Sequence, residues 1–233
     1  MPQQRRKNNP RVGAIILAAG SSQRMGSTNK IFAPLREKPL LAWSVDVCHK
    51  CSLIEEIVIT LNDENWEPAE KLTQERGWFK VTLCLGGPRR QDSAREGLSQ
   101  LKNCNWVLIH DGARPFLTPT LIEDGLKMAR ETGAAVAAVP VKDTIKLAMD
   151  NGLIEKTLPR HNLWISQTPQ VFQLDIIKRA YKELKTEVSD DAAAAEQLGY
   201  RVKTYMGDYN NIKVTTPEDL ALAELIAQDI TEE

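Results

Sequence analysis

Long apolar runs are missing from the sequence. No stretch reaches the ~20 residues that a membrane-spanning helix needs, and the opening segment MPQQRRKNNPR lacks the apolar core of a secretory signal. We therefore expect a soluble protein of the cytoplasm, in which residues 1–11 form a disordered basic tail.

A large net charge of either sign is also missing. The chain has 30 Lys and Arg residues against 31 Asp and Glu residues, which leaves a formal charge of -1 at pH 7. Such a chain has no overall positive field to attract nucleic acid or an anionic membrane surface, so we expect neither as a partner. A polyanionic ligand would have to be held by a local group of cations.

A disulfide scaffold is excluded by the low cysteine content. The 233 residues include 4 cysteines, and the cytosol keeps thiols reduced. Cys48 and Cys51 have the CxxC spacing of a zinc or redox site. However, no second CxxC pair or histidine cluster completes four zinc ligands, and thioredoxin-type pairs open a helix after a strand. This pair closes an amphipathic segment that starts at Pro39, so we expect two small apolar residues at a helix end.

The features that are present indicate an α/β fold. At roughly 150 residues per domain, the length allows one large domain or two small ones, and the lack of linkers and repeats favours one domain over residues 12–233. Short apolar runs alternate with segments of helical spacing. This predicts a Rossmann-like, mostly parallel twisted sheet with helices on both faces. The predicted strands are 12–19, 57–61, 81–85, 106–109 and 134–139.

Three helix starts are marked by capping residues. Thr118 and Thr216 each precede a proline. A threonine hydroxyl accepts a backbone N–H at a helix start, and proline suits the first helical position. The segment 189–191, Ser-Asp-Asp, is a third start of this kind.

Residues 141–164 interrupt the α/β alternation. Segments 144–147 and 153–156 flank an Asn151-Gly152 pair that suits a type I′ turn, which predicts a projecting β-hairpin arm. A lone two-stranded hairpin is marginal in water, so we expect the arm to pack on a second copy of the chain and form a homodimer. The alternative is that the arm folds back on its own sheet.

The loop after the first predicted strand, residues 18–30, is where a doubly wound sheet binds its ligand. It contains neither the GxxxxGK[ST] nor the GxGxxG motif. Small residues at 18–20 let the backbone approach a ligand, and N–H groups around residues 21 and 22 are able to form an anion nest. Arg24 and Lys30 add two cations suited to a polyphosphate, the alternative being a surface loop with two solvated cations.

A second group of functional residue types, HDGARP, follows the fourth predicted strand at 110–115. Asp111 is a candidate Mg²⁺ ligand, because hard cations prefer carboxylate and water oxygens. Arg114 is placed to meet an anionic substrate, with an ordinary salt bridge as the alternative. His110 is either a general base or a hydrogen-bonded strand residue, and we favour the latter because phosphate nucleophiles are ionised at neutral pH.

Six motifs in order make the pattern specific. They are AAG…RM…K (18–30), GG-x-x-R-x-x-S (86–93), HDGARP (110–115), VPVKDT-x-K (139–146), QTPQ-x-F (167–172) and NIK-x-T (211–215). With these motifs the chain resembles the sugar-phosphate nucleotidylyltransferases from residue 12 to about 226. Among them it is most similar to the 2-C-methyl-D-erythritol 4-phosphate cytidylyltransferases of the non-mevalonate isoprenoid pathway.

The resemblance implies transfer of CMP from CTP to the polyol phosphate, with Mg²⁺ as cofactor and release of pyrophosphate. It also implies a functional homodimer, in which the arm of one copy completes the site of the other. The implied residues are Arg24 and Lys30 for catalysis; Ala18, Ala19, Gly20, Gly87, Ser93 and Gly112 for CTP; Arg114, Thr168, Ser189 and Lys213 for the polyol phosphate, with Thr144 and Arg160 from the partner's arm; and Asp111 for the metal.

The chain departs from this family at four positions. Ser22, Asn29, Pro88 and Ser189 stand where relatives commonly have Gly, Pro, an acidic residue and Thr. Pro88 has no N–H, so a cytosine contact there must use its carbonyl or a neighbour.

Two other functions are compatible with this pattern. One is a ribitol 5-phosphate cytidylyltransferase, against which Ala113 argues weakly. The other is a non-catalytic nucleotide-sensing module on the same fold. The combination of Arg24, Lys30 and Asp111 argues against a silent module.

Overall fold

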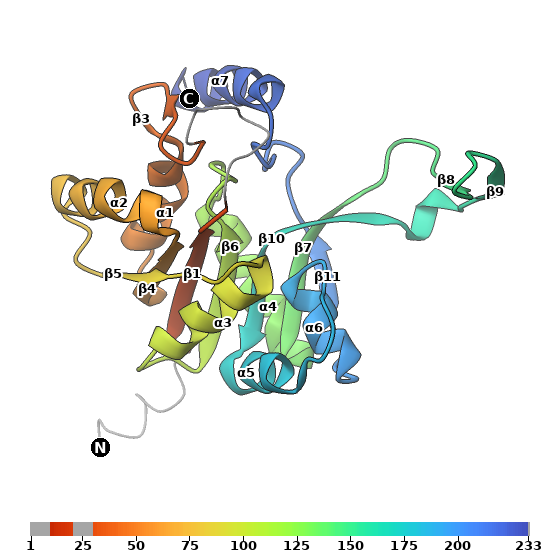
Figure 1. Cartoon of the computed structure of the whole chain (residues 1–233), viewed down its shortest axis with the longest axis horizontal. Helices are drawn as coiled ribbons and strands as arrows, with labels where there is room; N and C mark the ends of the chain where they lie inside the picture. Colours follow the sequence, from red (N-terminus) through yellow and green to blue (C-terminus); the bar gives the residue numbers. More distant parts are fainter. Residues whose placement is uncertain (1–9, 21–29, 233) are drawn as a thin grey trace.

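Seven strands form the central sheet of the computed structural model, which describes residues 10–20 and 30–232 (Figure 1). Strand β10 is antiparallel to both of its neighbours, and the other neighbouring pairs are parallel. The predicted Rossmann-like, mostly parallel sheet is therefore confirmed. In spatial order the strands are β11 (Lys203–Met206), β7 (Ala134–Pro140), β10 (Trp164–Gln173), β6 (Trp106–Asp111), β1 (Val12–Ala18), β4 (Ile54–Leu61) and β5 (Val81–Leu85).

Helices cover both faces of this sheet, as predicted. Along β1, Ala14 and Ile16 join one apolar cluster, whereas Ile15 joins another, because successive side chains of a strand point to opposite faces. The first cluster includes residues of α1 (Leu40–Lys50), α2 (Asp63–Arg76) and α4 (Pro119–Thr132). The second includes residues of α3 (Arg90–Gln100), α5 (Leu174–Glu183) and α6 (Asp191–Gln197). None of the described helices is long and apolar enough to cross a membrane.

The three predicted helix starts are found in the structure. Thr118 accepts a hydrogen bond from the N–H of Leu121 and Pro119 begins α4. The hydroxyl of Thr216 accepts a hydrogen bond from the N–H of Asp219. Helix α7 (Pro217–Glu232) begins at the residue directly after Thr216. This last helix packs against the short strand β2 (Pro34–Leu35), which pairs with β3 (Lys38–Pro39). Within the segment 189–191, the capping side chain is that of Asp190, at the start of α6.

Two strands of the sheet escaped prediction. Strand β10 has no continuous apolar run, since Ser166, Gln167 and Thr168 interrupt it and its pairing with β7 shifts register between Ser166 and Gln170. Strand β11 is a four-residue edge strand of mixed polarity. Both lack the pattern on which the other strands were recognised.

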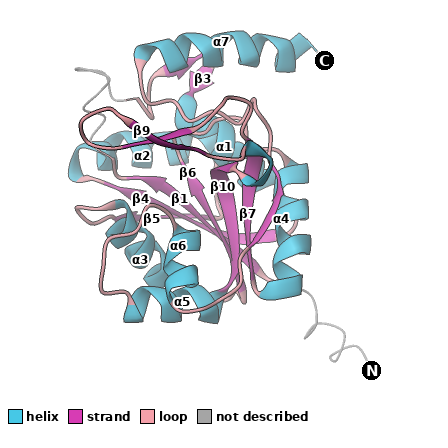
Figure 2. Ribbon diagram, turned by 90° about the vertical axis from the view of Figure 1, so that its right-hand side faces the viewer, coloured by secondary structure: helices cyan, strands magenta, loops and turns pink. Residues whose placement is uncertain are grey.

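The hairpin arm projects away from the sheet (Figure 1), and it lies in front of the sheet in the view turned by 90° (Figure 2). Its strands, β8 (Lys146–Ala148) and β9 (Ile154–Thr157), are exposed along their whole length. The alternative in which the arm folds back on its own sheet is therefore wrong. The predicted type I′ turn is also wrong, because that turn needs positive φ at both central residues. Gly152 has a φ of 82°, but among the described non-glycine residues only Arg36 has a positive φ.

The CxxC pair lies at a helix end, as predicted. Cys48 is buried in α1, and Cys51 directly follows the helix. Burial raises the pKa of the Cys48 thiol, which keeps it in the unreactive thiol form.

The predicted basic tail falls almost entirely outside the described residues. Arg11 is described, and its N–H donates to Oδ1 of Asn105 at 2.8 Å while its carbonyl accepts from the N–H of Trp106. The chain is thus tied to β6 from Arg11 onward.

Candidate active site

Two cavities open at the carboxyl edge of the sheet, where β1, β5 and β6 end. Their volumes are about 480 and 240 Å³. Arg90, Asp111 and Lys213 line both, so these three residues form the boundary that the cavities share. Of the predicted residues, Ala18, Ala19, Gly20, Lys30, Gly87, Ser93 and Asp111 line the larger cavity, and Asp111, Arg114, Thr168, Ser189 and Lys213 line the smaller.

The end of β1 is held in place by α2. The buried side chain of Asn65 donates from Nδ2 to the carbonyl of Ala18 at 3.1 Å. Asn62 caps α2 by accepting from the N–H of Asn65, and it also lines the larger cavity. The first turn of α2 therefore fixes the position at which the predicted nucleotide loop leaves the sheet.

Two glycines bring the β5–α3 turn close to that loop. A Cβ on Gly86 would lie 2.7 Å from Cβ of Ala19, and one on Gly87 would lie 2.4 Å from Cβ of Asp92. Oγ of Ser93 lies 3.2 Å from both the nitrogen and the oxygen of Gly87. The turn is thus pinned by Ser93 and leaves no room for larger residues, which explains the GG-x-x-R-x-x-S spacing.

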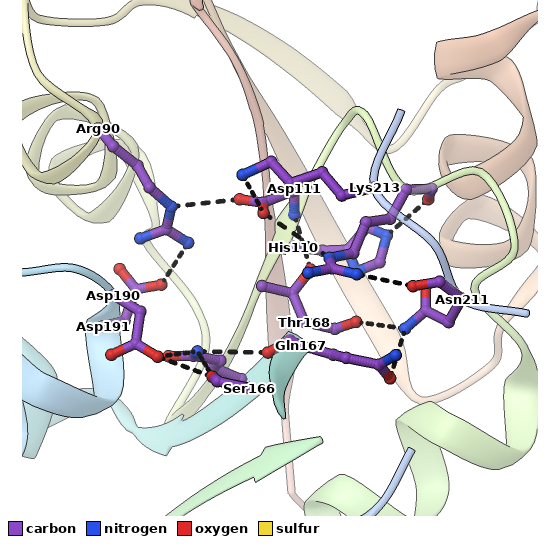
Figure 3. Close-up of polar contacts among 12 residues, drawn as sticks. Arg90, His110, Asp111, Ser166, Gln167, Thr168, Asp190, Asp191, Asn211 and Lys213 are labelled. Atoms are coloured by element: carbon purple, nitrogen blue, oxygen red, sulfur yellow. Dashed lines mark hydrogen bonds and ion pairs between the residues drawn. The ribbon is translucent and has the colours of Figure 1, made fainter. Parts of the chain in front are cut away.

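Asp111, the last residue of β6, is surrounded by cations (Figure 3). Nζ of Lys213 lies 2.8 Å from Oδ2, Nε of Arg90 donates to Oδ1 at 3.2 Å, and Nε of Arg114 lies 3.8 Å from Oδ2. Burial alone would raise the pKa of Asp111, but Arg90 and Lys213 hold it well below its usual range. The carboxylate is therefore ionised at neutral pH.

His110 has the structural role that we favoured. Its Nε2 lies 2.9 Å from the carbonyl of Arg114 and its Nδ1 lies 3.1 Å from Oγ1 of Thr168. A carbonyl only accepts, so Nε2 carries the proton and Nδ1 accepts from the hydroxyl of Thr168. That hydroxyl in turn accepts from the N–H of Asp111 at 3.0 Å. Burial lowers the pKa of His110 to about 4, which leaves a neutral ring that orients Thr168.

The segment that carries Lys213 is tied to the end of β6 and to β10. The buried side chain of Asn211 donates from Nδ2 to the main-chain carbonyl of Thr168 at 2.7 Å. The main-chain carbonyl of Asn211 accepts from Nη1 of Arg114 at 2.7 Å. The N–H of Val214 donates to the carbonyl of Ala113. These contacts on both sides of Lys213 place its ammonium group at Asp111.

The smaller cavity also has a polar wall formed by a hydroxyl, an amide and a carboxylate group, which the sequence analysis missed. Oγ of Ser166 donates to Oδ2 of Asp190 at 2.8 Å, and Nε2 of Gln170 donates to the same oxygen at 2.9 Å. Gln170 belongs to the QTPQ motif, which was the available signal. Cations at one end and hydroxyl, amide and carboxylate groups at the other suit a small molecule with one phosphate and several hydroxyl groups.

Comparisons with known proteins identify the family of the chain. The family model described as 2-C-methyl-D-erythritol 4-phosphate cytidylyltransferase, IspD, matches residues 12–229. The chain belongs to this family. An enzyme of that name from Dehalococcoides mccartyi strain 195 is 49% identical, over 94% of this chain and 96% of the relative. The predicted resemblance is therefore confirmed.

Solved structures of IspD-family proteins share the fold. The 4-diphosphocytidyl-2C-methyl-D-erythritol synthase from Anaerococcus prevotii has a TM-score of 0.85 and 28% identity, covering 94% of this chain and 97% of the other. The cytidylyltransferase from Thermus thermophilus has a TM-score of 0.77 and 30% identity, covering 94% and 99%.

Some residues that the IspD resemblance implied lie away from the cavities. Gly112 lines neither one; its N–H donates to the carbonyl of Leu17 at 2.8 Å. Thr144 and Arg160 lie on either side of the arm hairpin and reach neither cavity of their own chain, and Arg160 donates to the carbonyl of Lys142 at 2.6 Å. Arg24, Ser22 and Asn29 lie outside the described residues.

Asp111 supplies a single carboxylate as a candidate metal ligand. Among the residues that the structure describes, no group of three or more His, Cys, Asp and Glu side chains could enclose a metal ion. Mg²⁺ is commonly held by one or two carboxylates together with substrate phosphates and water. One ionised carboxylate on the boundary of both cavities meets that requirement.

Proposed function

We propose that the chain transfers the cytidylyl group of CTP to 2-C-methyl-D-erythritol 4-phosphate, releasing pyrophosphate, in isoprenoid precursor synthesis. The family relationship supplies the reaction. The observation that carries it here is the shared boundary of Arg90, Asp111 and Lys213 between the two cavities. Two phosphate-bearing substrates, one in each cavity, would have their phosphates meet at this boundary.

The larger cavity is the proposed CTP site. Small residues at the ends of β1 and β5 allow main-chain groups to approach the nucleotide, and Lys30 lines the same space. We propose Ala18, Ala19, Gly20, Gly87 and Ser93 as its walls, with Gly112 as a supporting residue behind them. Arg24 and Lys30 are proposed to neutralise the phosphates.

The smaller cavity is the proposed site of the polyol phosphate. Nε of Arg114 is buried there and has no hydrogen-bond partner among the described residues, which favours an anionic ligand. Thr168, Ser189 and Lys213 are proposed to complete the contacts.

The proposed reaction is an in-line displacement. An oxygen of the acceptor phosphate attacks the α-phosphorus of CTP and forms the new P–O bond, while the bond to the β-phosphate breaks and pyrophosphate leaves. No covalent enzyme intermediate is needed, and the ionised acceptor needs no base. The tasks of the chain are to align two anions and to neutralise their charge.

Asp111 is the proposed ligand of the metal, which we propose to be Mg²⁺. When bound, the ion would neutralise charge on the phosphates of CTP. Lys213, which contacts the carboxylate, would remain at the boundary to meet the phosphates.

We further propose a cytoplasmic homodimer with one nucleotidylyltransferase domain per chain. On the arm, the side chains of Leu147, Leu153 and Ile154 are 45%, 62% and 60% exposed. An isolated hairpin with this apolar surface is stabilised by packing on another protein. The arm would then deliver Thr144 and Arg160 to the smaller cavity of the partner. The four cysteines are free thiols, which suits a reducing compartment.

Product analysis tests this function. Purified protein would be incubated with Mg²⁺, each nucleoside triphosphate in turn, and either methylerythritol phosphate or ribitol 5-phosphate. We expect pyrophosphate and a cytidine diphosphate polyol only with CTP and methylerythritol phosphate. A product with ribitol phosphate instead, or no pyrophosphate with any pair, would contradict the proposal in favour of the ribitol enzyme or the silent module.

A further inference from the structure

We propose that Arg90 is a positioning residue that orients Asp111, and that Asp191 and Tyr181 hold Arg90 from behind. This inference rests on the proposed function, since it assigns Asp111 a role at the junction of the two substrates. Neither Asp191 nor Tyr181 lines either of the two cavities described above, so both would act on the site through Arg90.

Arg90 bridges two carboxylates with two nitrogens of its guanidinium group (Figure 3). Nε donates to Oδ1 of Asp111 at 3.2 Å, and Nη2 donates to Oδ2 of Asp191 at 2.8 Å. Oδ1 of Asp191 accepts from the hydroxyl of Tyr181. The guanidinium group is rigid and planar, so fixing Nη2 at Asp191 also fixes the direction in which Nε reaches Asp111.

Burying the Asp191 carboxylate, which holds Arg90, costs free energy. The side chain of Asp191 is 0% exposed, and an ionised carboxylate removed from water is stable only when its hydrogen bonds and charge are fully satisfied. Here Arg90 from α3 and Tyr181 from α5 together satisfy an aspartate at the start of α6. Apolar side chains of similar volume would pack these three helices at no such cost. The buried charges of Arg90 and Asp191 therefore point to a requirement at the other end of the bridge, where Arg90 meets Asp111.

That requirement is the orientation of Asp111. Arg90 takes Oδ1, whereas Oδ2 faces Lys213. A carboxylate held by one oxygen presents the other in a fixed direction, as supporting hydrogen bonds do for metal-ligating carboxylates in general. Lys213 has a flexible stem and is able to move to a phosphate, which would leave Oδ2 for the metal while Arg90 keeps Oδ1.

The main test removes the bridge without leaving a buried charge. In Arg90→Gln/Asp191→Asn, both buried groups are neutral, so folding does not depend on an unpaired carboxylate. We expect this variant to lose about 10- to 100-fold in kcat and in affinity for the metal, the usual range for lost support of a metal ligand. Tyr181→Phe removes one hydrogen bond two steps from Asp111 and should cause a smaller loss in the same direction.

Two matched controls separate positioning from general stability. Arg95→Gln removes an arginine five residues further along α3, which contacts Asp92 and the carbonyl of Tyr181 but not Asp111. Tyr205→Phe removes another buried phenol, which donates to main-chain carbonyls. Both controls should keep the kcat of the unsubstituted protein even where they lower the melting temperature.

The decisive readout does not require turnover. Binding of Mn²⁺ to the protein with CTP and without acceptor would be followed by water proton relaxation, next to kcat, the two KM values and thermal unfolding. The inference predicts weaker Mn²⁺ binding and lower kcat, with little change in KM for CTP. A folded double variant with unsubstituted Mn²⁺ binding and kcat would overturn it. Failure of the proposed function is distinguishable, because the unsubstituted protein would then form no cytidine diphosphate product.

Discussion

The carboxyl edge of the sheet and the hairpin arm satisfy their polar groups in opposite ways. At the edge, Asp111, His110 and Asn211 are all buried and are bonded to groups of the same chain. In the arm, every residue of β8 and β9 is exposed. The polar groups of the edge are thus preorganised by contacts within the chain, as a site that stabilises charge requires. The arm, by contrast, has no buried face within its own chain among the residues of β8 and β9.

This contrast separates two kinds of functional residue. Substitutions at the edge of the sheet should lower activity by removing a charge or by misaligning a side chain within one chain. Substitutions in the arm should lower activity by removing a contact between chains. Mixing two different variant proteins should then restore part of the activity.

The largest effect should come from a cation at the edge. Lys30→Ala removes an ammonium group from the larger cavity, and loss of one preorganised charge donor commonly costs about 10²–10³-fold in kcat. Steady-state kinetics with CTP should show a larger fall in kcat than rise in KM. Lys127→Ala, an exposed lysine on α4, is the control. Unchanged turnover in Lys30→Ala would remove Lys30 from the catalytic role, and the same substitution at Arg24 tests the other predicted cation.

Arg160→Ala should lower activity by about tenfold or more, because misplacing a substrate by even a small distance reduces the rate steeply. If Arg160 serves the partner's site, the Arg160→Ala protein mixed with Lys30→Ala should regain activity. Each mixed dimer has one site with an intact cavity and an intact arm from the other chain. Random exchange predicts recovery of about a quarter of full activity. No recovery in samples whose light scattering shows dimers would contradict delivery by the partner.

The pH dependence of stability should report the burial of the edge. Burial lowers the pKa of His110 from 6.5 to about 4, so between these values the unfolded chain binds a proton that the folded chain does not. Stability therefore falls as pH falls, by about 2 kcal/mol between pH 7 and 5. The lowered pKa of Asp111 adds a further loss only below about pH 4.

Denaturant unfolding at several pH values would check this expectation. His110→Asn should be less stable at pH 7 but should show a flatter slope, whereas His161→Asn, which removes an exposed histidine of the arm, should retain the slope. The prediction is contradicted if the slope persists without His110. Partial burial also lowers the pKa of His49, so a small slope of the same sign should survive in both variants.

The same contrast explains how far the sequence predicted the molecule. Strand β1 was recognisable because both of its faces are buried, which makes its run continuously apolar. Asp111 was recognisable as a site residue because it lies two residues after such a run. The position of Arg90 in the GG-x-x-R motif was visible, but its role was not, because its partner Asp191 is 101 residues away in the chain. Strand β10 was missed because its central residues serve the smaller cavity rather than the core.

The smallest effects should come from two glycines that share a backbone conformation. Gly133 ends α4 with a φ of 88°, and Gly152 lies in the arm turn with a φ of 82°. Alanine at either position is disfavoured by about 1–2 kcal/mol. At Gly133 the new Cβ also lies 2.3 Å from Cδ1 of Ile176, whereas at Gly152 it meets nothing within 4 Å.

Gly133→Ala should therefore lower the melting temperature by about 2–4 °C for each 1 kcal/mol, because α4 packs on the sheet and unfolds with it. Gly152→Ala should leave the melting temperature of the sheet unchanged and speed amide exchange in residues 146–157, as expected for a unit that opens locally. Circular dichroism and exchange mass spectrometry would distinguish the two variants. An equal fall in melting temperature for both would mean that the arm unfolds together with the sheet, and would remove the energetic basis for treating the two regions as separate.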